Sequence, residues 1–463
     1  MLYRYPFSLG VLALLTSLIA ILPRSPGQRN GEAPPITVGP NVQVSAVRAR
    51  INHAEVTLAA DPTNPKRMLA SAMYYPEGVA GSKVVGYMSG DGGKTWELSF
   101  ERLEEAKRMG LDPAVAYGPD GTAYCMDLSV QFPEKEPATP EEEAKAPKFG
   151  DPDVGYLHLA HSRDGGKTWA PISKLNRWID RPWLTVDRST GKYRGRLYCV
   201  GSIGQPLLYT SDDKGQTFSS PHLWSVKPGY WSFGIGNPVT LSDGTLIALY
   251  DGYIGSYAKD RTPYLAVRRS TDGGVSFGDE ALVGNWNVQN NPQLCLPAMA
   301  VDSGSTKYRD RLYVVWAEER ESGLQVRCSY SKDRGASWSK PVLLSEQPEG
   351  KAGEKTYNAC IPSVAVNKAG AVAVLWYDQR GLPSDGKGWN VRLRVSPDGG
   401  ETWLPSVQVN KVTSEKASLA LLGHTSGLAA DAEGVFHPLW IDNRTGVLQV
   451  WTAAVTVTAL VSI

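Results

Sequence analysis

Acidic residues stand at equivalent places near the start of several short apolar segments in this sequence. When the segments are aligned on a shared proline position, Glu55 and Asp112 come one place before it, and Asp180 comes two places before it. Two carboxyl groups that face each other across a small opening can act as general acid and as base or nucleophile in glycoside cleavage. Glu55, Asp112 and Asp180 are therefore candidate catalytic residues.

The same alignment supplies three candidate substrate-binding residues. Arg181 and Asn237 come just before the proline position, and His424 comes one place earlier. With the acids they form a polar arc that could equally bind a cation, hydrogen-bond sugar hydroxyls or only cap strand ends. The spacing of the cysteine and histidine residues offers no metal signature, so we expect neither a metal nor a cofactor.

An eight-residue box recurs six times and must help to position these segments. Its pattern is Ser-x-Asp-x-Gly-x-Thr-Trp, with Ser for Thr and Phe for Trp in some copies. An Asp in this setting bonds backbone N–H groups and holds a tight turn, and Gly supplies the positive φ that a hairpin connection needs. We interpret each box as a hairpin turn with a structural aspartate: Asp91, Asp164, Asp213, Asp272, Asp333 and Asp398.

Seven pairs of short apolar strands accompany the six boxes, beginning with residues 56–61 and 68–73. Each pair and its box hairpin would make a four-stranded antiparallel unit, and a ring of such units is a β-propeller. The sequence therefore predicts an all-β propeller over residues 42–463, with seven blades preferred and six as the alternative. We expect a strand near residues 42–47 to close the last blade, where residues 447–451 and 454–458 would form a hairpin without a box.

Six such boxes on a propeller resemble the Asp-box, or bacterial neuraminidase, repeats of the sialidase superfamily. The resemblance covers about residues 50–455 and implies a carbohydrate-active protein. The family opens an inner strand with Arg-Ile-Pro, but Cys360 precedes Ile361 and Pro362 here, and no blade has Arg at that place. Sialidases use three arginines to hold the substrate carboxylate. We therefore expect a sialidase-related exo-glycosidase of diverged specificity, or alternatively a non-catalytic propeller that binds a glycan or a protein.

Three later segments share a Trp-x-acid-x-Arg pattern and end at Arg320, Arg380 and Arg444. Three arginines on neighbouring blades would suit a carboxylate clamp. However, each Arg follows an acid by two residues and lies on the same face of its strand. We interpret the pattern as a repeated ion pair at a strand end.

The ends of the chain and its composition limit location and partners. The net charge is +1 and no basic block occurs, which argues against a nucleic-acid partner. Residues 1–22 resemble an export signal, with an uncleaved anchor as the lesser alternative, and no other membrane span is expected. Residues 23–41 would be an irregular lead-in, and the Pro- and Glu-rich residues 132–148 a loop. We expect a secreted or periplasmic protein whose partner is a carbohydrate or glycoconjugate, or an exported protein.

Overall fold

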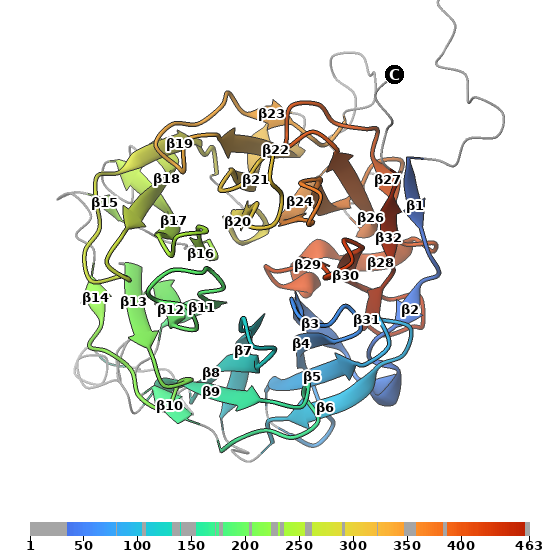
Figure 1. Ribbon diagram of the computed structural model, residues 1–463. Coiled ribbons are helices and arrows are strands. Elements are labelled where there is room, and N and C mark those ends of the chain that lie inside the picture. Colours follow the sequence, from blue (N-terminus) through green and yellow to red (C-terminus); the bar gives the residue numbers. More distant parts are fainter. Residues whose placement is uncertain are drawn as a thin grey trace, which may run out of the picture. The chain divides into compact units, whose positions relative to one another are not determined.

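Each repeat unit forms an antiparallel sheet, and seven such sheets surround a central channel (Figure 1). This confirms the all-β propeller and its seven blades. The computed structural model describes residues 35–79, 81–103, 108–131, 139, 154–171, 173–175, 179–202, 206–223, 230–231, 236–254, 262–288, 292–321, 323–346, 358–382 and 387–458. Within this part, no helix has the length and apolar character that a membrane crossing needs.

Two predicted segments fall mainly outside the described residues. The export signal at residues 1–22 lies outside them, as does nearly all of the loop at residues 132–148. The lead-in predicted at residues 23–41 is described only from residue 35 onward. There it includes a short strand, β1 (Ile36–Val38).

The first three blades each have four strands, ordered from the channel outward. Blade 1 contains β3 (His53–Ala60), β4 (Met68–Tyr74), β5 (Lys83–Ser89) and β6 (Glu97–Glu101). Blade 2 contains β7 (Met109–Tyr117), β8 (Ala123–Val130), β9 (Gly155–Ser162) and β10 (Ser173–Leu175). Blade 3 contains β11 (Asp180–Val186), β12 (Leu197–Ser202), β13 (Pro206–Ser211) and β14 (His222–Leu223).

The next three blades vary this plan slightly. In blade 4 the inner strand is split, so the blade contains β15 (Tyr230–Trp231), β16 (Val239–Thr240), β17 (Leu246–Ile254), β18 (Thr262–Ser270) and β19 (Ala281–Asn285). Blade 5 follows the 3₁₀ helix η2 (Pro292–Leu294) and contains β20 (Ala298–Val301), β21 (Leu312–Arg320), β22 (Gly323–Ser331) and β23 (Val342–Leu343). Blade 6 contains β24 (Ala359–Val366), β25 (Val372–Asp378), β26 (Lys387–Ser396) and β27 (Val407–Gln408), with β28 (Ser414–Ser418) added against β26.

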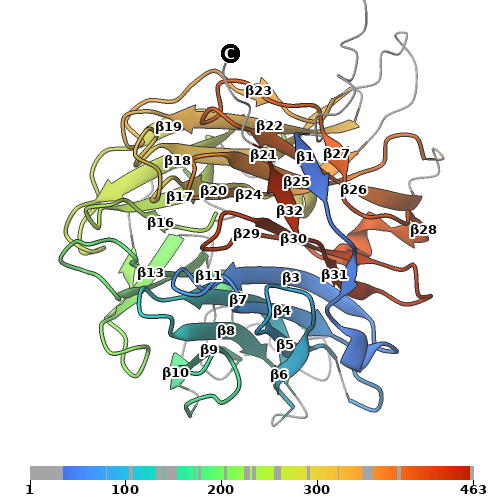
Figure 2. The same ribbon diagram turned by 45° about the vertical axis from the view of Figure 1, so that its right-hand side comes forward.

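Blade 7 joins the two ends of the chain and closes the ring. After the 3₁₀ helix η3 (Leu419–Leu422) it contains β29 (Gly427–Ala430), β30 (Phe436–Asp442), β31 (Gln449–Thr452) and β32 (Val455–Val457). From the N-terminal side, β2 (Val42–Gln43) pairs with β31, and β1 pairs with β32 and lies beside it in the turned view (Figure 2). The 3₁₀ helix η1 (Ala46–Arg48) then leads into blade 1. The predicted closing strand near residues 42–47 is confirmed.

The predicted hairpin of residues 447–451 and 454–458 is wrong. The two segments do not pair with each other, because β31 and β32 both pair with β30 in a single register. They therefore act as one interrupted third strand, and the N-terminal segment supplies the fourth. Alternation of apolar residues marked both segments as strands but carried no information about their partners.

The six boxes connect the third and fourth strands of blades 1 to 6, as predicted. In the first box, Oδ1 of Asp91 accepts hydrogen bonds from the backbone N–H groups of Lys94 and Thr95, at 3.0 Å each. Its Oδ2 accepts from the Thr95 hydroxyl, and the Ser89 hydroxyl accepts from the Gly93 N–H. Asp-to-hydroxyl bonds of the same kind recur at Asp164, Asp213, Asp272, Asp333 and Asp398.

The Trp-x-acid-x-Arg segments form ion pairs at the ends of β21, β25 and β30. Arg320 pairs with Glu318, Arg380 with Asp378 and Arg444 with Asp442. The three tryptophans of the pattern are fully buried. These arginines are therefore engaged by acids on their own blades, which confirms the structural interpretation and excludes a shared clamp.

Asn41 ties the N-terminal segment to two blades, so its removal should weaken ring closure. Its amide donates to the carbonyl of Val409 at 2.8 Å and accepts from the Lys411 N–H at 2.8 Å and from Arg444 at 3.0 Å. We expect Asn41→Ala to lower the free energy of unfolding by about 1–3 kcal/mol, because partly buried partners lose their bonds. Denaturant unfolding measures this. The exposed Thr37→Ala on β1 should change stability by less than about 0.5 kcal/mol, and equal effects of the two changes would contradict the role of Asn41.

Candidate functional site

The innermost strands of four blades carry a β-bulge near their first residues. At the bulge, Glu55, Asp112, Arg181 and Ile361 have φ angles of 50°, 48°, 50° and 50°, and the pairing register with the second strand shifts there. Left-handed conformations are uncommon outside glycine and cost about 1–3 kcal/mol each. Bulges of this kind re-aim a side chain. The residues that the sequence alignment placed together are thus structurally equivalent.

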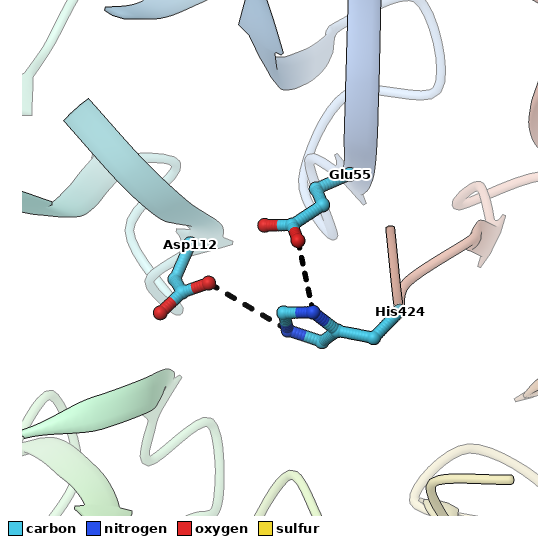
Figure 3. A group of neighbouring side chains, drawn as sticks. All are labelled: Glu55, Asp112 and His424. Atoms are coloured by element: carbon cyan, nitrogen blue, oxygen red, sulfur yellow. Dashed lines mark ion pairs between the residues drawn. The ribbon is translucent and has the colours of Figure 1, made fainter. Parts of the chain in front are cut away.

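Three of the predicted site residues meet in one cluster, from blades 1, 2 and 7 (Figure 3). Nδ1 of His424 lies 2.9 Å from Oε1 of Glu55, and Nε2 lies 3.7 Å from Oδ1 of Asp112. The backbone N–H of Arg181 donates to Oδ2 of Asp112 at 3.1 Å. Oε2 of Glu55 is buried and has no hydrogen-bond partner among the described residues. The imidazole therefore bridges two carboxyl groups, which also lie close enough together for a side-chain hydrogen bond between them to lower the pKa of Glu55 and raise that of Asp112.

The two carboxyl groups differ in their affinity for protons. Burial and the charge of Glu55 raise the pKa of Asp112 to about 8. Burial also disfavours ionisation of Glu55, but the charge and hydrogen bond of His424 outweigh it and lower the pKa of Glu55 below its usual value. Burial opposes protonation of His424, yet the charge of Glu55 prevails and raises the pKa of His424. At neutral pH Asp112 is thus protonated and Glu55 ionised.

Opposite protonation states in neighbouring carboxyl groups allow acid–base chemistry. Asp112 can give a proton to a leaving oxygen, and Glu55 can act as a base or nucleophile at the same pH. His424 holds Glu55 through Oε1 and stabilises its negative charge. Such separation of pKa values is a general mark of acid and base assignments in active sites.

Two cavities reach the cluster. A cavity of about 470 Å³ is lined by Glu55, Tyr75, Leu421 and Asn443, among others. A second one, of about 170 Å³, lies in the channel and is lined by His424 together with residues of the inner strands. The larger volume lies within the usual range of small-molecule sites, which is about 300–1,000 Å³.

Two residues near Glu55 were missed in the sequence. Tyr75 follows β4, lines the larger cavity and is 47% exposed, so its ring can pack against a sugar. Gly423 has a φ of +77°, and a Cβ there would lie 2.1 Å from Cγ of Glu55. A glycine directly before a candidate His was the available signal for close packing. No pattern in the sequence marked Tyr75.

The other predicted site residues lie near the same end of the central channel, where the inner strands begin, and do not join the cluster. We call each end of the channel a mouth. Asp180 begins β11, and its charge adds to the rise in the pKa of Asp112. Arg181 contributes its backbone N–H, and its charge favours the ionised form of Glu55. The amide of Asn237 bonds both backbone groups of Met299 in blade 5, at 2.6 and 2.8 Å. Asn237 therefore links two inner strands rather than facing the cluster.

A metal ion is a second possible occupant of the cluster. Glu55, Asp112 and His424 each offer a ligand atom, and these atoms lie within 4.8 Å of one another. Two carboxylates and an imidazole suit a divalent transition-metal ion. A cation was one of the ligands that the sequence allowed at this arc, and the described residues offer three ligand atoms for it. The expectation that the protein has no metal stays a prediction.

The arginine positions of the sialidase pattern are filled by buried thiols in two blades. Cys295 and Cys360 are both fully buried and unpaired, and burial raises the pKa of Cys360 above its usual value. These residues pack in the core and cannot replace guanidinium groups. Arg181 is the one arginine at the aligned mouth positions.

The cluster predicts a specific pH dependence of stability. The folded protein holds a proton on Asp112 up to a pKa of about 8, whereas the unfolded carboxyl loses it near 3.8. The folded state therefore binds more protons in this interval, and the free energy of unfolding should fall as pH rises through it. The raised pKa of His424 acts in the same direction.

Denaturant unfolding at pH 5.5 and pH 9 tests this dependence. Asp112→Asn should show a clearly smaller loss of stability between the two pH values, because a neutral amide replaces the titrating carboxyl. Glu433→Gln, which changes an exposed acid, should retain the full loss. An unchanged loss in Asp112→Asn would contradict the assigned protonation state.

Comparisons with known proteins place this geometry among related folds. No family model matches the chain. A sialidase from Bacteroides fragilis (strain YCH46) is 24% identical over 295 residues, which are 56% of this chain and 49% of that protein. A sialidase from Micromonospora viridifaciens is 27% identical over 216 residues, which are 43% of this chain and 31% of that protein. The matches thus span half or less of these relatives.

A solved structure agrees in fold. The crystal structure of a protein of unknown function from Dyadobacter fermentans DSM 18053 superposes with a TM-score of 0.52 and 12% identity, over 92% of this chain and 100% of that one. At this identity the likeness concerns the fold alone. The seven-bladed architecture and the similarity to two sialidases together fit a β-propeller of the sialidase superfamily.

Proposed function

We propose that this protein is a carbohydrate-active propeller that hydrolyses a glycosidic bond at the Glu55–His424–Asp112 cluster. The observation that carries the proposal is the pair of neighbouring carboxyl groups held at 2.9 and 3.7 Å from the two nitrogens of one imidazole, a setting that shifts the pKa values of Glu55 and Asp112 in opposite directions. Sequence similarity to two proteins named as sialidases supports the substrate class. The adjoining cavity of about 470 Å³ is large enough for a sugar.

The closeness of the two carboxyl groups favours a retaining reaction. Their ligand oxygens lie within 4.8 Å, whereas inverting enzymes separate the carboxyl groups by about 6.5–9.5 Å. Oε2 of Glu55 would attack the anomeric carbon while the bond to the leaving oxygen breaks and Asp112 protonates that oxygen. A water molecule would then give its proton to Asp112 and displace the sugar from Glu55.

The substrate is proposed to be a neutral sugar rather than a sialic acid. Recognition of a carboxylate by three arginines has no counterpart here, since Cys295 and Cys360 take two of the aligned positions and are buried. Glu55 and Asp180 would repel an anionic substrate. The diverged exo-glycosidase predicted from the sequence is thus the favoured form of the proposal.

One observation favours the alternative of a non-catalytic propeller. Oε2 of Glu55 is buried, and Gly423 packs directly against the Glu55 side chain. Catalysis therefore requires the segment that contains η3 and Gly423 to move away from Glu55. If this segment stays packed against Glu55, the cluster only holds the inner strands together. The cavity beside Tyr75 would then bind a glycan without cleaving it.

Turnover of aryl glycosides tests the proposal. We expect hydrolysis of at least one neutral aryl glycoside in a panel that includes a sialoside. Glu55→Gln and Asp112→Asn should each lower kcat/KM by about 10²–10⁴-fold. Asp431→Asn is the matched control, because it alters another buried 2.9 Å His–carboxylate pair, with His437, on the opposite end of blade 7. The control should retain activity if its fold is intact.

Rescue by azide separates a catalytic effect of Asp112→Asn from a structural one. Azide needs no general base, so it should restore turnover in Asp112→Asn and yield a glycosyl azide. No turnover by a folded wild type on the whole panel would overturn the hydrolase and leave the binding alternative. Turnover of the sialoside alone would overturn the neutral-sugar assignment.

The pH profile of the same reaction is a separate prediction. Because Asp112 must be protonated to act as the acid, kcat/KM should fall as pH rises through about 8. Asp112→Asn should show no such fall above pH 8 in its residual activity on a substrate with a highly activated leaving group. A wild-type profile that stays flat to pH 10 would contradict Asp112 as the acid.

A further inference from the structure

The opposite end of the central channel is lined by two arginine side chains. There the last residues of the inner strands and the loops that follow them enclose a cavity of about 350 Å³. Arg188 comes from the loop between β11 and β12, and Arg309 from the loop between β20 and β21. Ser242 and Ser303 also line it. Glu55 and Asp112 lie near the starts of the same inner strands, so the two sites are at opposite mouths.

Neither guanidinium has a protein partner within the described residues. No hydrogen bond, ion pair or ring contact from another described residue engages the side chain of Arg188 or Arg309. This contrasts with Arg194 in the same loop as Arg188, which donates to the carbonyl of Ser189 at 2.8 Å. Arg311, two residues beyond Arg309, donates to the carbonyl of Gly399. The arginines that face the channel are thus the ones left free.

Among the residues that the structure describes, no carboxyl group lines this cavity. The acidic side chains of the adjoining loops accept hydrogen bonds from serine residues of these loops. Asp187 accepts the Ser189 N–H at 2.7 Å and is fully buried, and Asp302 accepts the Ser305 N–H at 2.8 Å and is fully buried. Asp310 accepts two hydrogen bonds from Ser242. Among the described residues, the two guanidinium groups therefore have no direct ion-pair partner in the cavity.

Arg188 is exposed to water in the channel and is available to a ligand. The surrounding loops reduce the hydration of its charge and lower the pKa of Arg188 from its ordinary value, with no carboxylate contributing. An anion in the channel would accept charge-assisted hydrogen bonds from this guanidinium group.

We propose that Arg188 and Arg309 form an oxyanion-binding site for a ligand that carries a phosphate or sulfate group. Planar guanidinium groups match the oxygens of such groups with paired hydrogen bonds. The inner strands are sheet edges, so their channel-facing backbone groups can add hydrogen bonds. The volume suits a small ligand such as a phosphorylated or sulfated sugar rather than a polymer. This site is independent of the proposed hydrolysis.

Binding of inorganic phosphate and of sulfate, each measured by calorimetry at low ionic strength, tests the site. The wild type should bind at least one of the two anions, and chloride at equal ionic strength should not replace it. Arg188→Gln and Arg309→Gln should each weaken binding about tenfold or more. Lys192→Gln and Lys307→Gln are matched controls, since each removes one exposed charge from the same two loops without lining the cavity. They should bind as the wild type does.

Thermal unfolding adds a readout that a structural role would not produce. Without an anion, Arg188→Gln should unfold at about the same temperature as the wild type, because the exposed side chain has no protein partner among the described residues. With phosphate or sulfate the wild type should unfold at a higher temperature than Arg188→Gln, since only the wild type gains from binding. No anion binding by the wild type, or equal losses in the lysine controls, would overturn the proposal. A lower Tm of Arg188→Gln without anion would also overturn it.

Discussion

Pairing between the two ends of the chain is the constraint on which both the ring and the candidate site depend. β1 and β2 complete blade 7 against β32 and β31, so blade 7 is held beside blade 1. That contact brings His424 to 2.9 Å from Glu55. Every blade buries its faces against its neighbours, for example through Trp389 of blade 6, which donates to the carbonyl of Ile441 in blade 7. An open ring would expose these faces and separate the members of the cluster.

Much of the fold could be predicted from the sequence because its determinants are local and repeated. The six boxes fix hairpin turns through Asp, Gly and hydroxyl residues, and alternation fixes the strands. Strand pairing in blade 7 could not be predicted in detail, since nothing local shows that residues 447–458 form one interrupted strand. Aligning the inner strands placed Glu55, Asp112 and Arg181 at one register, which proved to be a bulge with positive φ. The alignment could not show that Asn237 bonds Met299, or that Tyr75 lies near Glu55, because both depend on packing between segments.

The two mouths of the channel present different charged groups, with carboxyl groups at one and arginines at the other. At one mouth, strained residues and a buried carboxyl with a raised pKa are kept close together by His424. At the other, Arg188 and Arg309 have no side-chain partner among the described residues. Strain and unpaired charge usually persist only where the surrounding scaffold imposes them, and they concentrate at functional sites. A rigid seven-bladed ring supplies such a scaffold at both ends.

Carbon-detected NMR titration of the side-chain carboxyl groups measures the protonation state of Asp112, on which the proposed acid–base chemistry depends. We expect one aspartate carboxyl that titrates near pH 8 and is missing from the spectrum of Asp112→Asn. The Glu55 resonance should remain that of an ionised carboxylate throughout the neutral range. If all aspartate carboxyl groups instead titrate below about pH 5, as unperturbed groups do, Asp112 is not an acid at neutral pH and the cluster has only a structural role.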